Sequence, residues 1–196
     1  LTTWLVACEI VTQMGVADLA GHLCMYKVHL LLVNLLYGLQ LATQVLVGSE
    51  VERGHIQRAR WTIWRSIRLG ISVSTFASCC MYMCRHRIAA VFTDDPEVIE
   101  AFSDLAIPAA TLLWLYGILW IVDGACYGVG DFTYVAILTL VGAVAAVACM
   151  MLFASSAVGV WWCLNVLIAI RTVAVLYRVF VDPNSPIVRG NVAKKV

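Results

Sequence analysis

Two aspartates and three glycines lie together at the end of a long apolar run, in the segment WIVDGACYGVGDF at residues 120–132. Asp123 lies about two helical turns inside this run if the helix continues to Gly130. A carboxylate at that depth in a bilayer is costly, so it either takes up a proton or pairs with a cation. Arg171, inside a later apolar run, is a cation that it can pair with. We therefore expect either a proton-exchanging group at Asp123 or a structural polar contact with Arg171, which otherwise serves as an anchor near the membrane surface.

The glycines of the same segment predict close helix packing and a tight turn. Gly124 and Gly128 are four residues apart, a G-x-x-x-G spacing that lets another helix approach closely. Gly130 is expected to help end the helix as a C-terminal cap. Asp131 falls in the short turn that follows, where we expect it to be solvated or to cap the next helix.

A second set of polar residues interrupts the apolar run at 28–48, namely Asn34, Tyr37, Gln40 and Gln44. Gln40 and Gln44 are four residues apart and share one helix face. These side chains either form a cavity wall that contacts a polar solute or make interhelical hydrogen bonds, worth about 0.6–2 kcal/mol each. Both interpretations stay open, and together with Asp123 these four are the candidate solute-contacting residues.

The elements that carry these residues are predicted to be membrane helices. The chain of 196 residues is 62% hydrophobic and 13% charged, with a mean hydropathy of +0.90, whereas a soluble domain is about 45–50% apolar and about 25% charged. A helix needs about 20 mostly apolar residues to cross a bilayer. Five windows qualify, at roughly 28–48, 67–91, 105–128, 132–156 and 158–180, and a sixth at 1–14 looks truncated. We therefore expect an all-α, polytopic membrane helix bundle over residues 1–181, with five full transmembrane helices and one truncated helix.

Seven of the thirteen basic residues lie in two segments outside these windows. They occupy the expected loop at 49–66 and a polar C-terminal tail at 182–196, which includes Arg189, Lys194 and Lys195. Excess Lys and Arg marks the inner side of a membrane, so the tail is expected to be cytoplasmic, or stromal in a plastid. A nucleic-acid partner is not expected, because such binding needs basic residues clustered on a folded face.

Neither an enzyme nor a metal protein is expected. The four histidines are scattered along the chain, and the eight cysteines lie mostly within apolar runs without C-x-x-C spacing, which is typical of packing residues. The sequence thus predicts no catalytic residue, no metal site and no cofactor.

One short surface helix is expected between two spans. The stretch TDDPEVIEAF at 93–102 offers Asp94 or Asp95 as an N-cap and Pro96 at the first helical position. This helix is expected to lead into the 105–128 span.

Six stretches, taken in order, resemble a known family of membrane proteins. They read MGVADLAGH, LQLATQVLVG, QRAR, VFTDDPEVI, IVDGACYGVGDFTYVA and VGVWWCLNVLIAIR. Together they are similar to the C-terminal half of the multidrug and toxic compound extrusion (MATE) transporters, over about residues 10–180. The stretch containing Asp123 looks most like the DinF branch, and within it the plastid-type plant DETOXIFICATION proteins.

The resemblance implies a secondary active antiporter that exports organic solutes or xenobiotics in exchange for H⁺ or Na⁺. That family is built from two six-helix lobes around a central cavity that opens alternately to each side. The partners implied are the lipid bilayer, a small organic solute, and either a missing N-terminal lobe or a second copy of the chain. The implied location is a multi-pass position in a membrane, a plastid membrane if the protein is plant-like. The alternative is a non-transporting membrane scaffold or an inactive truncated product.

Overall fold

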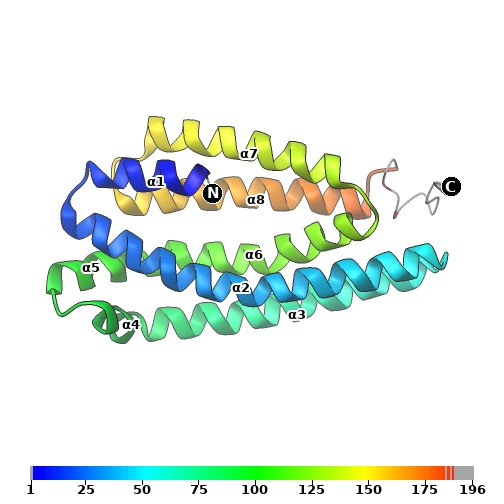
Figure 1. The fold of residues 1–196 in the computed structure, drawn as a ribbon, viewed down its shortest axis with the longest axis horizontal. Helices are drawn as coiled ribbons and strands as arrows, with labels where there is room; N and C mark the ends of the chain where they lie inside the picture. Colours follow the sequence, from blue (N-terminus) through cyan, green and yellow to red (C-terminus); the bar gives the residue numbers. More distant parts are fainter. Residues whose placement is uncertain (1, 184, 186, 188–196) are drawn as a thin grey trace.

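The computed structural model describes residues 2–183, 185 and 187, and over these residues it contains helices and no strand (Figure 1). The predicted basic residues Arg189, Lys194 and Lys195 lie outside the described part. The helices are α1 (Thr2–Thr12), α2 (Val16–Glu52), α3 (Ile56–Met83), α4 (Arg85–Phe92), α5 (Pro96–Asp104), α6 (Ala106–Gly128), α7 (Phe132–Phe153) and α8 (Ala157–Phe180). The fold is therefore the all-α membrane bundle that the sequence predicts.

Four helices, α2, α6, α7 and α8, are long and apolar enough to cross a membrane, and α3 with α4 forms a fifth candidate that bends by 69°. The window at 67–91 was expected to be one span, and the structure corrects this by breaking it at Cys84. Arg85, His86 and Arg87 follow the break directly. Because charged side chains are unfavourable in hydrocarbon, the chain turns at these residues instead of continuing along the direction of α3.

The predicted loop at 49–66 is wrong for most of its length. Helix α2 continues to Glu52 and α3 begins at Ile56, so only residues 53–55 connect them. Val47, Val51, Ala59 and Ile63 of the two helices are buried in one hydrophobic cluster, and this packing keeps both helices intact beyond the apolar windows. With its 37 residues, α2 is about 55 Å long, which exceeds a hydrocarbon core of about 30 Å.

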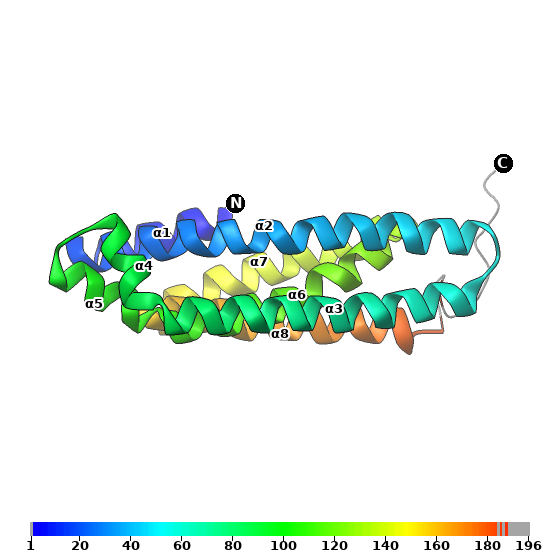
Figure 2. The ribbon, with the colours of Figure 1, turned by 90° about the horizontal axis from the view of Figure 1, so that it is seen from below.

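Helix α6 lies at the centre of the bundle and packs against α2, α3 and α8. Figures 1 and 2 show α7 on the far side of α8 from α6, and α1 lying alongside α2 at one end of the bundle. Helix α1 contacts both α2 and α7. It has 11 residues, fewer than the about 20 that a helix needs to cross a bilayer.

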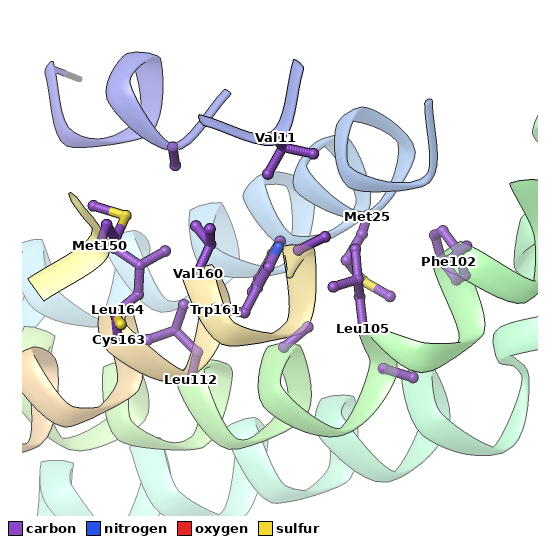
Figure 3. Close-up of a cluster of buried hydrophobic side chains, with 14 of the residues drawn as sticks. Val11, Met25, Phe102, Leu105, Leu112, Met150, Val160, Trp161, Cys163 and Leu164 are labelled. Carbon is purple, nitrogen blue, oxygen red and sulfur yellow. The ribbon is translucent and has the colours of Figure 1, made fainter. Parts of the chain in front are cut away.

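The largest hydrophobic cluster lies beneath α1 (Figure 3). Trp161 of α8 is fully buried there, with Val11 of α1, Met25 of α2 and Leu112 of α6 in the same cluster. These four helices are thereby joined at one end of the bundle, which leaves the other end to be closed by different contacts.

The turn between α6 and α7 has the geometry that its glycine predicts. Gly130 has a φ of 78°, its N–H donates to the Tyr127 carbonyl at 3.1 Å, and the Asp131 N–H donates to the Cys126 carbonyl at 2.9 Å. This pair of bonds is a Schellman motif, in which the residue with positive φ is usually glycine. The α6 helix itself ends at Gly128, which places Asp123 closer to the helix end than a helix running to Gly130 would.

The short helix α5 begins one residue after its cap. The Asp95 carboxylate accepts a hydrogen bond from the Glu97 N–H at 3.0 Å, and Pro96 is the first helical residue. Of the two aspartates offered by the sequence, Asp95 is therefore the N-cap.

Candidate functional site

A cavity of about 440 Å³ opens between α2, α6, α7 and α8. Its lining combines aromatic, amide, hydroxyl and charged side chains: Tyr37, Gln40, Leu41, Gln44, Tyr116, Trp120, Asp123, Tyr127, Thr139 and Arg171. We call this cavity the polar chamber. It brings together four of the five candidate solute-contacting residues, Tyr37, Gln40, Gln44 and Asp123, and adds Arg171.

The fifth candidate, Asn34, does not line the polar chamber. Its side chain is exposed, and Nδ2 donates to the Leu30 carbonyl of the same helix at 2.9 Å. Asn34 lies seven residues before Leu41, on the same side of α2 but about 10 Å further along the helix axis.

An ion pair joins α8 to α6 at the chamber. Arg171 Nη2 donates to Asp123 Oδ2 at 2.6 Å, and the two side chains are 16% and 7% exposed. Asp123 Oδ1 and Arg171 Nε are buried and have no hydrogen-bond partner among the described residues. Of the two alternatives that the sequence leaves open for Asp123, the structure shows pairing with Arg171.

The G-x-x-x-G motif positions the two glutamines. A Cβ added at Gly124 would lie 2.5 Å from the Gln40 carbonyl oxygen, and one at Gly128 would lie 2.5 Å from the Gln44 carbonyl oxygen. The backbones of α2 and α6 therefore approach through these glycines, as small residues allow in membrane helices. This contact fixes Gln40 and Gln44 of α2 beside Asp123 of α6.

The aromatic residues that α6 contributes to the chamber were missed by the sequence analysis. Tyr116, Trp120 and Tyr127 follow spacings of four and seven residues on α6 and share one helix face with Asp123. Trp120 meets the Tyr37 ring of α2 edge to face, with ring centroids 5.3 Å apart. The helical spacing of these three α6 aromatics can be recognised in the sequence, whereas nothing in the sequence around Thr139 of α7 indicates that it lines the chamber.

Asp131 was expected to be solvated or to cap α7, and the structure corrects both. It lies at the N-cap position of α7 without a side-chain capping bond. Its carboxylate accepts a hydrogen bond from Arg178 Nε at 2.8 Å, and both side chains are mostly buried. Arg178 also donates to Asp182 at 2.5 Å. The last turn of α8 is thus tied to the turn between α6 and α7.

A second, smaller cavity of about 160 Å³ continues from the polar chamber toward α1. The two cavities share Tyr116, Thr139 and Arg171, and the second also reaches Trp4. Beyond Trp4, Trp161 Nε1 donates to His22 Nδ1 at 3.1 Å. The Trp4 ring also lies near the His22 ring, with centroids 6.3 Å apart, so the smaller cavity leads toward this hydrogen bond.

The described residues contain no group of three or more side chains with metal-binding potential. The polar chamber thus offers hydrogen-bonding, aromatic and paired charged groups. An all-helical bundle with four to five candidate spans and an open polar chamber between its helices defines a polytopic membrane protein.

The comparisons with known proteins agree with this class. The family model MatE matches residues 5–152, so the chain belongs to the MatE family, whose members are transporters rather than enzymes. The chain is 25% identical over 182 residues to Protein DETOXIFICATION 44, chloroplastic, of Arabidopsis thaliana, with 91% of this chain and 34% of the relative covered. It is 26% identical over 178 residues to Protein DETOXIFICATION 45, chloroplastic, of the same plant, with 89% and 31% covered.

Solved structures show the same fold. A structure described as the inward-facing conformation of a multidrug resistance MATE family transporter of the MOP superfamily superposes with a TM-score of 0.84 at 16% identity, covering 94% of this chain and 43% of that one. The chain thus spans about a third of the length of the two curated relatives and less than half of the solved structure.

Proposed function

We propose that this chain forms one lobe of a secondary active antiporter that exports organic solutes in exchange for H⁺ or Na⁺ by alternating access. One observation carries the proposal: the polar chamber gathers Tyr37, Gln40 and Gln44 of α2 with Asp123 of α6 and Arg171 of α8. Polar and charged groups inside a membrane bundle mark solute and ion pathways. Transporters place such sites between two helical units that move relative to one another.

The proposed partner is a second helical lobe facing the polar chamber, either an N-terminal lobe or another copy of this chain. The chamber opens between α2 and α7, and its opening has no cover among the described residues. Alternating access requires two units around one site, so an opposing unit would complete the wall and alternate the access.

The proposed location is a multi-pass position in a plastid membrane, with the C-terminal tail on the stromal side. The chloroplastic names of the two relatives support the organelle. The arginines at the α2–α3 turn support the orientation, because Lys and Arg accumulate on the inner side. That turn and the end of α8 lie at the same end of the bundle (Figure 1).

The test is solute efflux from proteoliposomes under an imposed proton gradient and, separately, an imposed sodium gradient. We expect one gradient to accelerate efflux of an entrapped fluorescent aromatic solute. Gln44→Ala should slow this efflux about fivefold, the factor that corresponds to loss of one hydrogen bond of about 1 kcal/mol. Asn34→Ala is the matched control on the same helix, because Asn34 lies outside the chamber, and it should leave the efflux unchanged.

The partner is tested by the same assay with two forms of the protein. Flux by the 196-residue chain alone supports paired copies, whereas flux that appears only with an N-terminal lobe supplied supports the two-lobe arrangement. Gradient-independent leakage, or no flux in either form, would refute transport and leave a membrane scaffold.

A further inference from the structure

We infer that the outer face of α3, near the α2–α3 turn, is a binding surface for anionic lipid headgroups. Four guanidinium groups and two indole rings make up this surface. They belong to Arg58, Arg60, Trp61, Trp64, Arg65 and Arg68, and we call them the arginine face. The surface lies outside the polar chamber, so the inference does not depend on transport of a solute.

The helical repeat gathers these residues on the outer side of α3. The inner side carries Ala59, Ile63 and Ile67, which follow at intervals of four residues and are buried in a cluster with residues of α2 and α6. The arginine face occupies the remaining positions of the same turns. Its indole rings, Trp61 and Trp64, are 60% and 51% exposed. The face therefore points away from the bundle.

The four arginines of this face have no acidic partner within the part of the chain that the structure describes. Two other arginines at the same end are paired, because Arg53 lies 3.8 Å from Glu50 and Arg178 binds Asp131 at 2.8 Å. The Arg60 Nε atom is buried and has no hydrogen-bond partner among the described residues. Since arginine stays charged in proteins, the arginine face carries four positive charges that the described residues leave uncompensated.

The indole rings suit the level of the lipid headgroups, where tryptophan is enriched. The Arg65 guanidinium lies over the Trp61 ring, with Cζ 5.4 Å from the ring centroid. Trp64 stacks on Phe180 of α8, with centroids 4.7 Å apart. A guanidinium that stacks through its flat face leaves its in-plane N–H groups available, and these donate well to phosphate oxygens.

The length of the charge-free part of α3 supports the same level. Residues 69–83 carry no charged side chain and extend about 22 Å along the helix. Arg68 precedes this stretch and Arg85 follows it. The hydrocarbon core is about 30 Å thick, and long arginine side chains reach outward to its polar surface. A span formed by this stretch therefore places Arg68 at the edge of the hydrocarbon and the rest of the arginine face among the headgroups.

The position of α3 argues against a solute or an opposing lobe as the occupant of this face. The polar chamber is lined by residues of α2, α6, α7 and α8. Figure 1 shows α3 and α7 at opposite edges of the bundle, whereas the chamber opens between α2 and α7. The arginine face thus lies away from the chamber opening, on a surface that lipid covers when α3 spans a membrane.

The charge of the face selects the class of lipid. In phosphatidylcholine an ammonium group compensates the phosphate, whereas phosphatidylglycerol keeps one net negative charge. Each basic residue near an anionic membrane surface contributes about fivefold in affinity. We therefore expect the arginine face to prefer phosphatidylglycerol over phosphatidylcholine at least tenfold at low salt, and the preference should fall as added salt screens the charges.

The experiment measures quenching of tryptophan fluorescence by lipids that carry bromine in the acyl chains near the headgroup. The 196-residue chain is placed in bilayers that contain either brominated phosphatidylglycerol or brominated phosphatidylcholine, with identical acyl chains. The chain has seven tryptophans, so the signal of the face is taken as the difference between the unmodified chain and Trp61→Phe. The ratio of the two quenching constants gives the lipid preference beside Trp61.

Arg65→Gln should lower this ratio about fivefold, because it removes one uncompensated charge beside Trp61. The matched control is Arg53→Gln at the same end of the bundle, where the guanidinium already lies beside Glu50. It removes the same formal charge and should change the ratio less than twofold. Both arginines are exposed, and helical circular dichroism checks that each variant keeps its fold.

The inference is overturned if the unmodified chain shows a ratio near one, or if Arg53→Gln lowers the ratio as much as Arg65→Gln. Inorganic phosphate added at constant ionic strength should leave the ratio unchanged, and a fall to one would assign the face to soluble anions instead. Weak quenching by both lipids that rises when the chain is diluted in the bilayer would show that a second copy covers the face, which also overturns the lipid assignment.

Discussion

Replacing Gly124 by alanine tests whether the backbone contact between α2 and α6 holds the lobe together. The added Cβ would lie 2.5 Å from the Gln40 carbonyl oxygen. An ordinary contact begins near 3.4 Å, so the helices must separate by about 0.9 Å, since a backbone carbonyl in a helix cannot rotate away. Overpacking of this kind costs about 1–3 kcal/mol. Because 1 kcal/mol corresponds to about 2–4 °C for a chain of this size, we expect the apparent Tm in detergent to fall by about 2–12 °C.

The matched control is Gly38→Ala on α2. A Cβ there meets nothing within 4 Å, and alanine favours a helix over glycine by about 1 kcal/mol, so Gly38→Ala should leave the Tm unchanged or raise it. Thermal unfolding is followed by the loss of helical circular dichroism. An unchanged Tm in Gly124→Ala, or an equal decrease in both variants, would show that the helices do not meet through this glycine.

Two further substitutions test contacts at opposite ends of the lobe. Arg178→Gln removes the ionic hydrogen bonds that hold the turn at Asp131, so the free energy of unfolding in a reversible detergent titration should fall by about 2 kcal/mol. Arg65→Gln, at an exposed position, is the control. Equal losses in both variants would contradict a stabilising contact between Arg178 and Asp131. Trp161→Phe keeps a large ring but loses the indole N–H donor, so the free energy of unfolding should fall by about 1 kcal/mol or more. The control, Trp114→Phe at a half-exposed ring, should have no effect. An unchanged free energy in Trp161→Phe would show that the indole hydrogen bond does not stabilise the core.

The later helices were predicted more accurately than the earlier ones. The predicted spans 105–128, 132–156 and 158–180 agree with α6, α7 and α8 to within three residues at each end, because glycine and polar residues mark those ends. The predictions at 28–48 and 67–91 failed at their boundaries. Hydropathy marks only the apolar part of a helix, whereas α2 and α3 continue beyond the apolar windows and pack against one another there.

The candidate site shows the same division between local and distant signals. Gln40 and Gln44 could be paired from their spacing, and the Asp123 segment from its glycines. Arg171 could be named as a possible partner of Asp123, because both lie inside apolar runs. The contact itself required tertiary structure, since Arg171 lies 48 positions later. Thr139 joined the chamber only because α7 packs on α8, and a single sequence contains no record of which helices become neighbours.

The length of α2 has a consequence for measuring motion in this protein. Gln44 lies in the chamber and Arg53 lies at the turn after the same unbroken helix, about 13 Å further along its axis. A tilt of α2 that changes the chamber by a fraction of an ångström therefore produces a displacement several times larger at the turn. A spectroscopic label at the exposed Arg53 can therefore report motion of the chamber wall from the end of the bundle.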